Sequence, residues 1–205
     1  LGLPTPVEDI LNTSIVLINY LKQHLPAAHL FVIGEPSLSA ELQQFGFQLC
    51  DEPDHIQAVI ASNDRNFDYK KLKTAFEAIR AGAVLLATNA DRTRPIVGGG
   101  EEPDAAPIIA AIETSTSHPL DMLIGKPSPY FARVAMQIAQ AQPKDCILVG
   151  DNLETDIQMG LEVGMNPTLT LSGVTREKML RESRVQPDFV IRRLIEIIPQ
   201  SMLEN

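Results

Sequence analysis

The sequence has little of what marks an exported or membrane-spanning protein. It holds two cysteines, Cys50 and Cys146, which lie far apart and each in an apolar stretch. Two such cysteines provide no disulfide framework, and we expect both to be reduced residues of the core. No run approaches the ~18 apolar residues of a membrane span. The first residues also lack the basic and apolar segments of a signal peptide, so we expect a cytoplasmic protein.

Positive charge is scarce as well. The chain has 17 lysines and arginines against 26 aspartates and glutamates, which gives a formal net charge of -9 at pH 7. Nucleic-acid binding relies on a basic face, so this balance argues against a nucleic-acid partner. Apolar residues make up 44% of the chain, which is enough for a sizeable core and too many for global disorder. We therefore expect a folded protein that binds neither nucleic acid nor a membrane.

Short apolar runs alternate with amphipathic segments along most of the chain. This pattern predicts an α/β fold with mainly parallel strands. The expected strands are 9–13, 30–33, 47–50, 58–61, 84–87, 122–124, 146–149, 168–171 and 188–191. The expected helices are 14–25, 37–45, 69–79, 105–112, 128–140, 155–163, 175–183 and 193–198. Residues 92–103 are rich in proline, glycine and charge and are predicted as a loop, and the polar stretch 113–119 is the best boundary between two lobes.

Two carboxylates follow one of these runs. We expect residues 146–149 to form a buried parallel strand, and Gly150, Asp151 and Asp156 lie at and just beyond its carboxyl end. In an open α/β sheet, ligands bind at that edge. Paired carboxylates after a glycine that permits a tight turn suit a hard cation such as Mg²⁺.

A lysine occupies the same position after another run. Lys126 follows the expected strand 122–124 and precedes the helix predicted from residue 128. A lysine at that position is suited to binding phosphate. Mg²⁺, a lysine and a helix amino-terminus are together the groups that phosphoryl-transfer sites use. Each group has an ordinary explanation by itself, because acids favour helix starts and lysines are usually solvated. Their combination at one sheet edge favours a catalytic site.

Several segments together resemble the NagD-like phosphatases, the class IIA branch of the haloacid dehalogenase superfamily. The segments are Gly-Lys-Pro-Ser-Pro (125–129), Val-Gly-Asp-Asn-Leu-Glu-Thr-Asp-Ile (149–157) and Leu-Ser-Gly-Val (171–174). Asp-Arg-Asn-Phe (64–67) and Ala-Thr-Asn-Ala-Asp (87–91) are similar to cap segments of that family. The resemblance implies a Rossmann-like parallel-sheet core, incomplete at the amino terminus, with an inserted α/β cap. The implied domains are a core remnant 1–25, a cap 26–117 and a catalytic core lobe 118–205.

The resemblance also implies roles for individual residues. Lys126 would stabilise the transferring phosphoryl group, and Asn152 would orient the groups around it. Asp151 would bind Mg²⁺, and Asp156 would assist the metal directly or through another ligand. The implied substrate-contacting residues are Arg65, Asn89 and Asp91. These three also have a simpler interpretation, in which Asn89 and Asp91 are turn residues and Arg65 belongs to an ordinary loop.

The family's nucleophile motif, Asp-x-Asp-Gly, does not occur in the 205 residues. The resemblance therefore implies that this sequence is part of a longer protein and that the strand 146–149 lacks a neighbour here. The complete protein would hydrolyse a small phosphorylated metabolite, such as a nucleotide or sugar phosphate. An aspartyl-phosphate would form on an aspartate missing from this chain. The family also suggests a homodimer through the cap.

Two other hypotheses fit part of the pattern. The chain could be a catalytically inactive fragment or short product that binds a phosphorylated metabolite or a partner protein. The missing nucleophile favours this hypothesis, whereas Lys126 and Asp151 argue against it. A receiver-like domain that accepts phosphate on an aspartate fits the sheet edge and the lysine, but it does not account for the inserted lobe.

Overall fold

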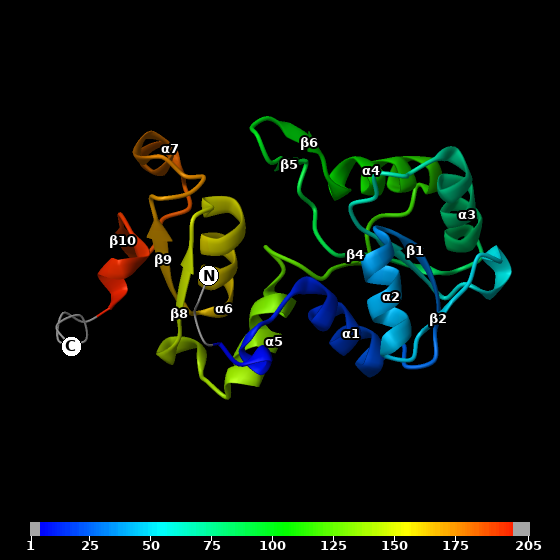
Figure 1. Ribbon diagram of the computed structural model, residues 1–205, viewed down its shortest axis with the longest axis horizontal. Coiled ribbons are helices and arrows are strands. Elements are labelled where there is room, and N and C mark those ends of the chain that lie inside the picture. The colour runs from blue at the N-terminus through cyan, green and yellow to red at the C-terminus, as the bar shows by residue number, and fades with distance from the viewer. Residues whose placement is uncertain (1–4, 199–205) are drawn as a thin grey trace. The chain divides into compact units, whose positions relative to one another are not determined.

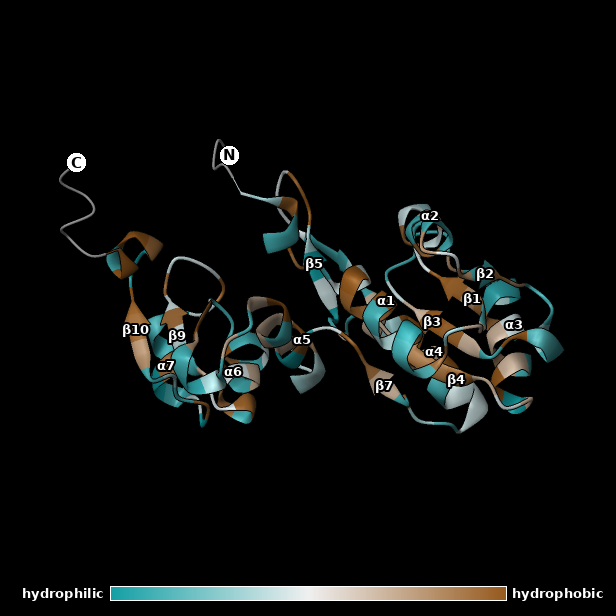
Figure 2. Ribbon diagram, turned by 90° about the horizontal axis from the view of Figure 1, so that it is seen from below, coloured by the Kyte–Doolittle hydropathy of each residue, from teal (hydrophilic) through white to brown (hydrophobic). Residues whose placement is uncertain are grey.

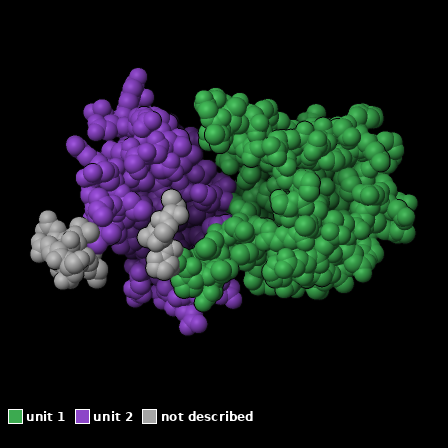
Figure 3. Space-filling model, in the orientation of Figure 1, with its two compact units in different colours: residues 1–125 green, residues 126–205 purple. Residues whose placement is uncertain are grey.

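The computed structural model describes residues 5–198, and residues 1–4 and 199–205 lie outside the described part. The chain divides into two compact units, unit 1 (1–125) and unit 2 (126–205), which Figure 3 draws in different colours. Each unit contains parallel strands and helices (Figure 1), so the predicted α/β class is confirmed. The expected functional division into 1–25, 26–117 and 118–205 stays a prediction.

Unit 1 contains a five-stranded parallel sheet in the order β2-β1-β3-β4-β7. Its strands are β1 (His29–Ile33), β2 (Gln48–Leu49), β3 (Ala58–Ala61), β4 (Val84–Ala87) and β7 (Met122–Leu123). Its helices are α1 (Thr13–His24), α2 (Pro36–Gln44), α3 (Tyr69–Arg80) and α4 (Ala105–Thr116). β2 lies on one side of β1, whereas β3, β4 and β7 follow on the other side. The direction in which successive strands are added therefore reverses between β1 and β3. In doubly wound sheets, the crevice at that reversal is where ligands bind.

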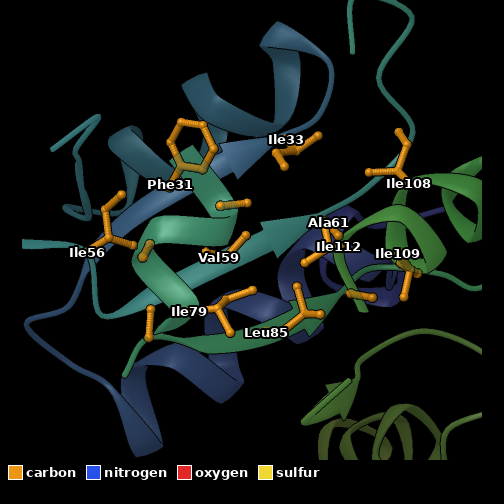
Figure 4. Packing of buried hydrophobic residues seen from close by; sticks show 14 of the residues in the cluster. Phe31, Ile33, Ile56, Val59, Ala61, Ile79, Leu85, Ile108, Ile109 and Ile112 are labelled. Carbon is orange, nitrogen blue, oxygen red and sulfur yellow. The ribbon is translucent and has the colours of Figure 1, made fainter. Parts of the chain in front are cut away.

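Of the central strands of unit 1, β3 and β4 are apolar along their whole length and β1 is apolar after His29, as expected of strands covered on both faces. The ribbon of β1, β3 and β4 is accordingly hydrophobic in Figure 2. Alternate residues such as Ile33, Val59 and Leu85 pack against α3 and α4 (Figure 4). The next residues along, including Leu30 and Ile60, are fully buried outside that cluster. This arrangement fixes the carboxyl ends of β1, β3 and β4 side by side.

Two expectations for unit 1 are wrong. Residues 9–13 form no strand, because Asn12 caps α1 by accepting a hydrogen bond from the backbone N–H of Ile15 at 2.9 Å. Residues 92–103 form an antiparallel hairpin of β5 (Thr93–Pro95) and β6 (Glu101–Pro103) in place of a loop. The run 98–100 turns the chain at its tip, where all three glycines have positive φ.

Unit 2 contains a three-stranded parallel sheet in the order β10-β9-β8. Its strands are β8 (Ile147–Gly150), β9 (Asn166–Thr170) and β10 (Phe189–Ile191). Its helices are α5 (Pro129–Ala139), α6 (Gln158–Val163) and α7 (Glu177–Glu182), and η4 (Leu153–Ile157) is a π-helical turn leading into α6. The 3₁₀ turns of the chain are η1 (Val7–Asp9), η2 (Pro53–His55), η3 (Pro143–Asp145) and η5 (Leu194–Ile197).

The strand before the acidic motif is not buried as expected. Ile147 is 59% exposed and the rest of β8 is half-buried. The physical reason is its position at the edge of the sheet, because β9 is its only strand neighbour among residues 5–198. Along its other edge, the backbone N–H and C=O groups of β8 therefore have no strand partner in the described part of the chain.

Both cysteines are free, as expected, but half-buried where core positions were predicted. Across the described residues, no helix is long and apolar enough to cross a membrane.

Leu85→Ala should unfold unit 1 more easily than a surface change does. Leu85 is fully buried in the centre of the sheet, and truncating such a leucine typically costs about 2–5 kcal/mol of unfolding free energy. Val97→Ala, at an exposed position in the hairpin tip, should stay within about 0.5 kcal/mol. Urea unfolding followed by circular dichroism measures both, and equal effects would contradict the packing described here.

Candidate phosphoryl-transfer site

Asp156 lies at the centre of the predicted site in unit 2. It is 5% exposed and sits in η4, where its carboxylate faces back toward the end of β8. Its Oδ1 accepts a hydrogen bond from Lys126 Nζ at 2.8 Å. Its Oδ2 accepts the backbone N–H groups of Asp151 and Asn152, each at 3.2 Å. One buried carboxylate thus fixes both the lysine and the loop that follows the strand.

Gly150 is needed for this close approach. A Cβ at residue 150 would collide with the side chain of Asp156. Gly150, which the sequence indicated as a turn residue, therefore also leaves room for the Asp156 carboxylate to reach the backbone N–H groups of the loop.

Asp151 is held from the other side by residues 171–174. Its Oδ2 accepts the backbone N–H of Val174 at 2.8 Å, and its backbone C=O accepts the N–H of Thr175 at 3.0 Å. A Cβ at Gly173 would collide with the Asp151 carboxylate, so only glycine fits there. Within the described residues, Oδ1 of Asp151 has no hydrogen-bond partner, and the residue as a whole is half-buried.

Lys126 and Asn152 complete the cluster in unit 2. The Lys126 side chain is half exposed, and α5 begins just after it, with Ser128 Oγ accepting the backbone N–H of Tyr130 at 3.3 Å. The Asn152 side chain accepts the backbone N–H of Glu154 at 3.0 Å and so caps η4. Four of the predicted site residues, Lys126, Asp151, Asn152 and Asp156, are therefore brought together by direct hydrogen bonds or adjacent backbone.

The remaining predicted site residues belong to unit 1. Arg65 follows β3 and pairs with Glu35, which follows β1, through Nε–Oε1 at 2.9 Å and Nη2–Oε2 at 3.0 Å. These hydrogen bonds from Arg65, and that from its backbone N–H, lower the pKa of Glu35 from 4.5 to about 2. Asn89 follows β4 and accepts the backbone N–H of Asp91 at 3.2 Å, which is an Asx turn.

The carboxyl edge of the unit 1 sheet carries a cleft of about 300 Å³. Glu35, Asn63, Asn89 and Arg94 are among the residues that line it, whereas Asp91 is not. Sequence analysis missed Glu35 and Asn63. Each lies two residues beyond the end of its strand, and β1 and β3 are neighbours in the sheet, so this pattern could have found them once the strand order was known.

Comparison with known proteins identifies the family. The family model described as HAD-hydrolase-like matches residues 123–197. The sugar-phosphatase AraL of Bacillus subtilis is 34% identical over 197 residues, which cover 96% of this chain and 71% of AraL. The chain belongs to the haloacid dehalogenase-type phosphatases of the NagD-like branch. The p-nitrophenyl phosphatase from Archaeoglobus fulgidus is 28% identical, and the similarity covers 96% of this chain and 77% of that one with a TM-score of 0.89. NagD from E. coli K-12 is 28% identical, with 96% of this chain and 76% of that one covered and a TM-score of 0.85.

The carboxylates present fit the Mg²⁺ ion that such phosphatases generally use. Mg²⁺ is commonly held by one or two protein carboxylates, with waters and substrate oxygens completing its shell. Asp151 offers an unpartnered oxygen for such an ion. The described residues contain no group of three or more His, Cys, Asp or Glu side chains that could enclose a metal.

Gly173→Ala should disturb the site through Asp151. The added methyl group needs the space that the carboxylate occupies, and such overpacking typically costs about 1–3 kcal/mol of unfolding free energy. Ser172→Ala, at the exposed neighbouring residue, is the matched control and should change stability little. Thermal unfolding of both variants measures this, and equal melting temperatures would show that Gly173 does not clamp Asp151.

Glu35→Gln should remove part of the acid sensitivity of unit 1. A carboxyl whose pKa is lowered by folding stabilises the folded state above its ordinary pKa, and this contribution is lost as the pH falls from about 4.5 to about 2. We expect the Tm difference between the wild-type chain and Glu35→Gln to shrink across that window. Because the pair is partly exposed, added salt should also reduce the difference.

The control for this experiment is Glu8→Gln, an exposed glutamate without an ion pair in the described structure. A Tm difference for Glu35→Gln that stays constant between pH 5 and pH 2 would contradict the lowered pKa of about 2.

Proposed function

We propose that this chain supplies the metal and phosphate-binding groups of a Mg²⁺-dependent phosphatase that hydrolyses a small phosphomonoester. Asp151 is the proposed metal ligand and Lys126 the proposed phosphate-binding cation. The nucleophilic aspartate is proposed to lie outside the 205 residues, since no Asp-x-Asp-Gly motif occurs within them. The single observation that carries the proposal is the Asp156 carboxylate, which holds Lys126 and the Asp151 loop together.

Asp156 is proposed to act mainly by positioning. Its two oxygens already receive three donors, whereas one oxygen of Asp151 has no partner among the described residues. The pairing with Asp156 restricts Lys126, although half of its side chain remains accessible to a ligand. Asn152, whose side chain caps η4, keeps the loop amides oriented toward Asp156. Preorganised charges of this kind stabilise a transition state without having to reorganise.

The proposed reaction has two displacement steps. The aspartate oxygen attacks phosphorus, the bond from phosphorus to the alcohol oxygen breaks, and that oxygen takes a proton to leave as the alcohol. Water then attacks the aspartyl-phosphate, which releases inorganic phosphate and restores the carboxylate. Lys126 would hold the negative charge of the equatorial phosphate oxygens in both steps. Bound Mg²⁺ would supply further neutralisation of that charge.

The names of the relatives support sugar phosphates or similarly small phosphomonoesters as the substrate class. AraL is named a sugar-phosphatase, and a relative from Corynebacterium glutamicum, 28% identical over 196 residues, is named a dihydroxyacetone phosphatase. For this chain, Arg65, Asn89 and Asp91 in unit 1 are proposed to contact the substrate. Their hydrogen bonds in unit 1 are equally compatible with the turn and loop roles that the sequence left open.

Two further expectations remain proposals. One is a homodimer formed through residues 26–117, the proposed cap, and the other is a cytoplasmic location.

Phosphate release by the protein expressed from its complete reading frame tests the proposal. A panel of sugar phosphates, triose phosphates and nucleotides is assayed with Mg²⁺ and with a chelator. Asp151→Asn should remove most of the Mg²⁺-dependent turnover. Lys126→Ala should lower kcat by about 10²-fold or more, the scale seen when one electrostatic stabiliser is removed.

Matched controls come from unit 2 itself. Lys144→Ala and Glu162→Gln change exposed residues of the same types outside the proposed site and should keep wild-type rates. Retained activity in Asp151→Asn would contradict the metal assignment. An intact mass of 22.5 kDa for the natural protein, together with no turnover, would favour the alternative of a short product that binds a phosphorylated metabolite.

A further inference from the structure

The cleft at the carboxyl edge of the unit 1 sheet is lined mainly by uncharged hydrogen-bonding groups. Helices α1 and α2, which lie next to each other in Figure 1, both begin at its wall. Hydroxyl and amide side chains make up most of the described lining, and Leu38 is the one apolar side chain among those residues. Such a wall suits the hydroxyl groups of a ligand better than it suits hydrocarbon.

Some of these groups have hydrogen-bonding capacity left for a ligand. Thr88 Oγ1 donates to Ser62 Oγ at 2.8 Å, which leaves the Ser62 proton without an acceptor in the described structure. Asn89 uses its oxygen for the backbone N–H of Asp91, while its Nδ2 has no partner there. The exposed Ser37 hydroxyl likewise makes no hydrogen bond among the described residues. A ligand hydroxyl both donates and accepts, so it can pair with each of these groups.

The positive groups around the cleft already have partners. Arg94 Nε donates to Glu102 Oε1 at 2.7 Å, and the Arg65 guanidinium is held by both oxygens of Glu35. The start of α1 is capped by the side chain of Asn12, which accepts a backbone N–H of the first turn. Within the described wall, an anionic group of a ligand would therefore find no cation without a partner.

Glu41 is the charged residue of the wall that has no counter-ion. It lies one turn after Ser37 on α2, so the two side chains are on the same face of that helix. Glu41 is half-buried, and its carboxylate makes no ion pair or hydrogen bond in the described structure. Because a partly buried charge is screened less than an exposed one, this carboxylate repels any negative group that enters the cleft.

We propose that the cleft selects phosphomonoesters whose alcohol part is uncharged and carries hydroxyl groups, and that Glu41 excludes an alcohol part with a second negative charge. This inference rests on the proposed function, in which Asn89 contacts the substrate and Lys126 binds its phosphate. Ser37, Ser62 and Asn89 provide hydrogen bonds to the hydroxyl groups. Glu41 is a specificity-determining residue, because it disfavours one class of substrate and does not touch the reacting atoms.

Two substrates with the same carbon skeleton test this selection in the protein from its complete reading frame. Glucitol 6-phosphate and 6-phosphogluconate differ only in the group at the far end, which is a hydroxymethyl in the first and a carboxylate in the second. With Mg²⁺ present, kcat/KM should be about tenfold or more higher for glucitol 6-phosphate, since like charges placed together disfavour the anionic substrate. Raising the ionic strength should reduce this ratio.

Replacing the carboxylate of Glu41 tests its part in the selection. Glu41→Gln should raise kcat/KM for 6-phosphogluconate by about fivefold or more, and by a larger factor than for glucitol 6-phosphate. A gain on one substrate is not a result that damaged packing produces. Glu77→Gln is the matched control, because Glu77 is a half-buried glutamate of α3 outside the cleft, and it should leave the ratio of the two substrates unchanged.

Hydrolysis of p-nitrophenyl phosphate in the same assay separates this inference from the proposed function. Suppose that p-nitrophenyl phosphate is hydrolysed, but the two six-carbon substrates are hydrolysed equally or not at all. That result would overturn the inference and leave the proposed function standing, and so would an unchanged ratio in Glu41→Gln. No Mg²⁺-dependent turnover of any of the three compounds would overturn both.

Discussion

The hydrogen bonds made by the Asp156 carboxylate are the constraint on which the site in unit 2 depends. They join the lysine that precedes α5 to the loop that follows β8, and Asp156 itself lies 30 residues after that lysine. Because Asp156 is buried, its attraction to Lys126 is only partly weakened by solvent. Gly150 leaves the space that the Asp156 side chain needs to make these hydrogen bonds. Without this carboxylate, no side-chain hydrogen bond would join Lys126 to the loop that carries Asp151.

Asp151 illustrates how the fold leaves one oxygen available to a ligand. Val174 holds one of its oxygens by a backbone hydrogen bond, and Gly173 provides the room for the contact. A carboxylate held by one oxygen has a fixed direction, while its second oxygen can bind a cation. The segment 171–174 thus positions Asp151 through a backbone N–H and the space at a glycine. The NagD-like membership of the chain and this geometry together support the proposed role.

Much of the fold follows from local patterns, and the failures have identifiable causes. The strands at 58–61 and 84–87 were predicted with the bounds that the structure has, because short apolar runs between turn residues are typical of central parallel strands. The hairpin at 93–103 was missed because its strands are short and each ends in a proline, which weakens any strand pattern. Burial of β8 was overestimated from its apolar sequence, although the family resemblance had implied that this strand lacks a neighbour here, and among residues 5–198 its only strand neighbour is β9.

The candidate site shows the same limit of sequence analysis. Lys126, Asp151 and Asp156 could be predicted because they follow strand-like runs within recognisable motifs. The pair of Glu35 with Arg65, and the cleft that Glu41 and Ser62 both line, could not. They depend on which strands are neighbours and on how α2 packs beside them, and both are tertiary features. The domain bounds and the substrate contacts of the cap remain predictions for the same reason.

Metal binding is the most direct test of the claim that Asp151 is the metal ligand. Mn²⁺ can be used in place of Mg²⁺ because electron paramagnetic resonance detects it. The protein from its complete reading frame should bind one Mn²⁺ ion that added Mg²⁺ displaces. The Asp151→Asn variant should lose this binding, while Glu162→Gln should retain it. Equal Mn²⁺ binding by Asp151→Asn and the wild-type protein would contradict the assignment of Asp151 as the metal ligand and with it the proposed phosphatase site.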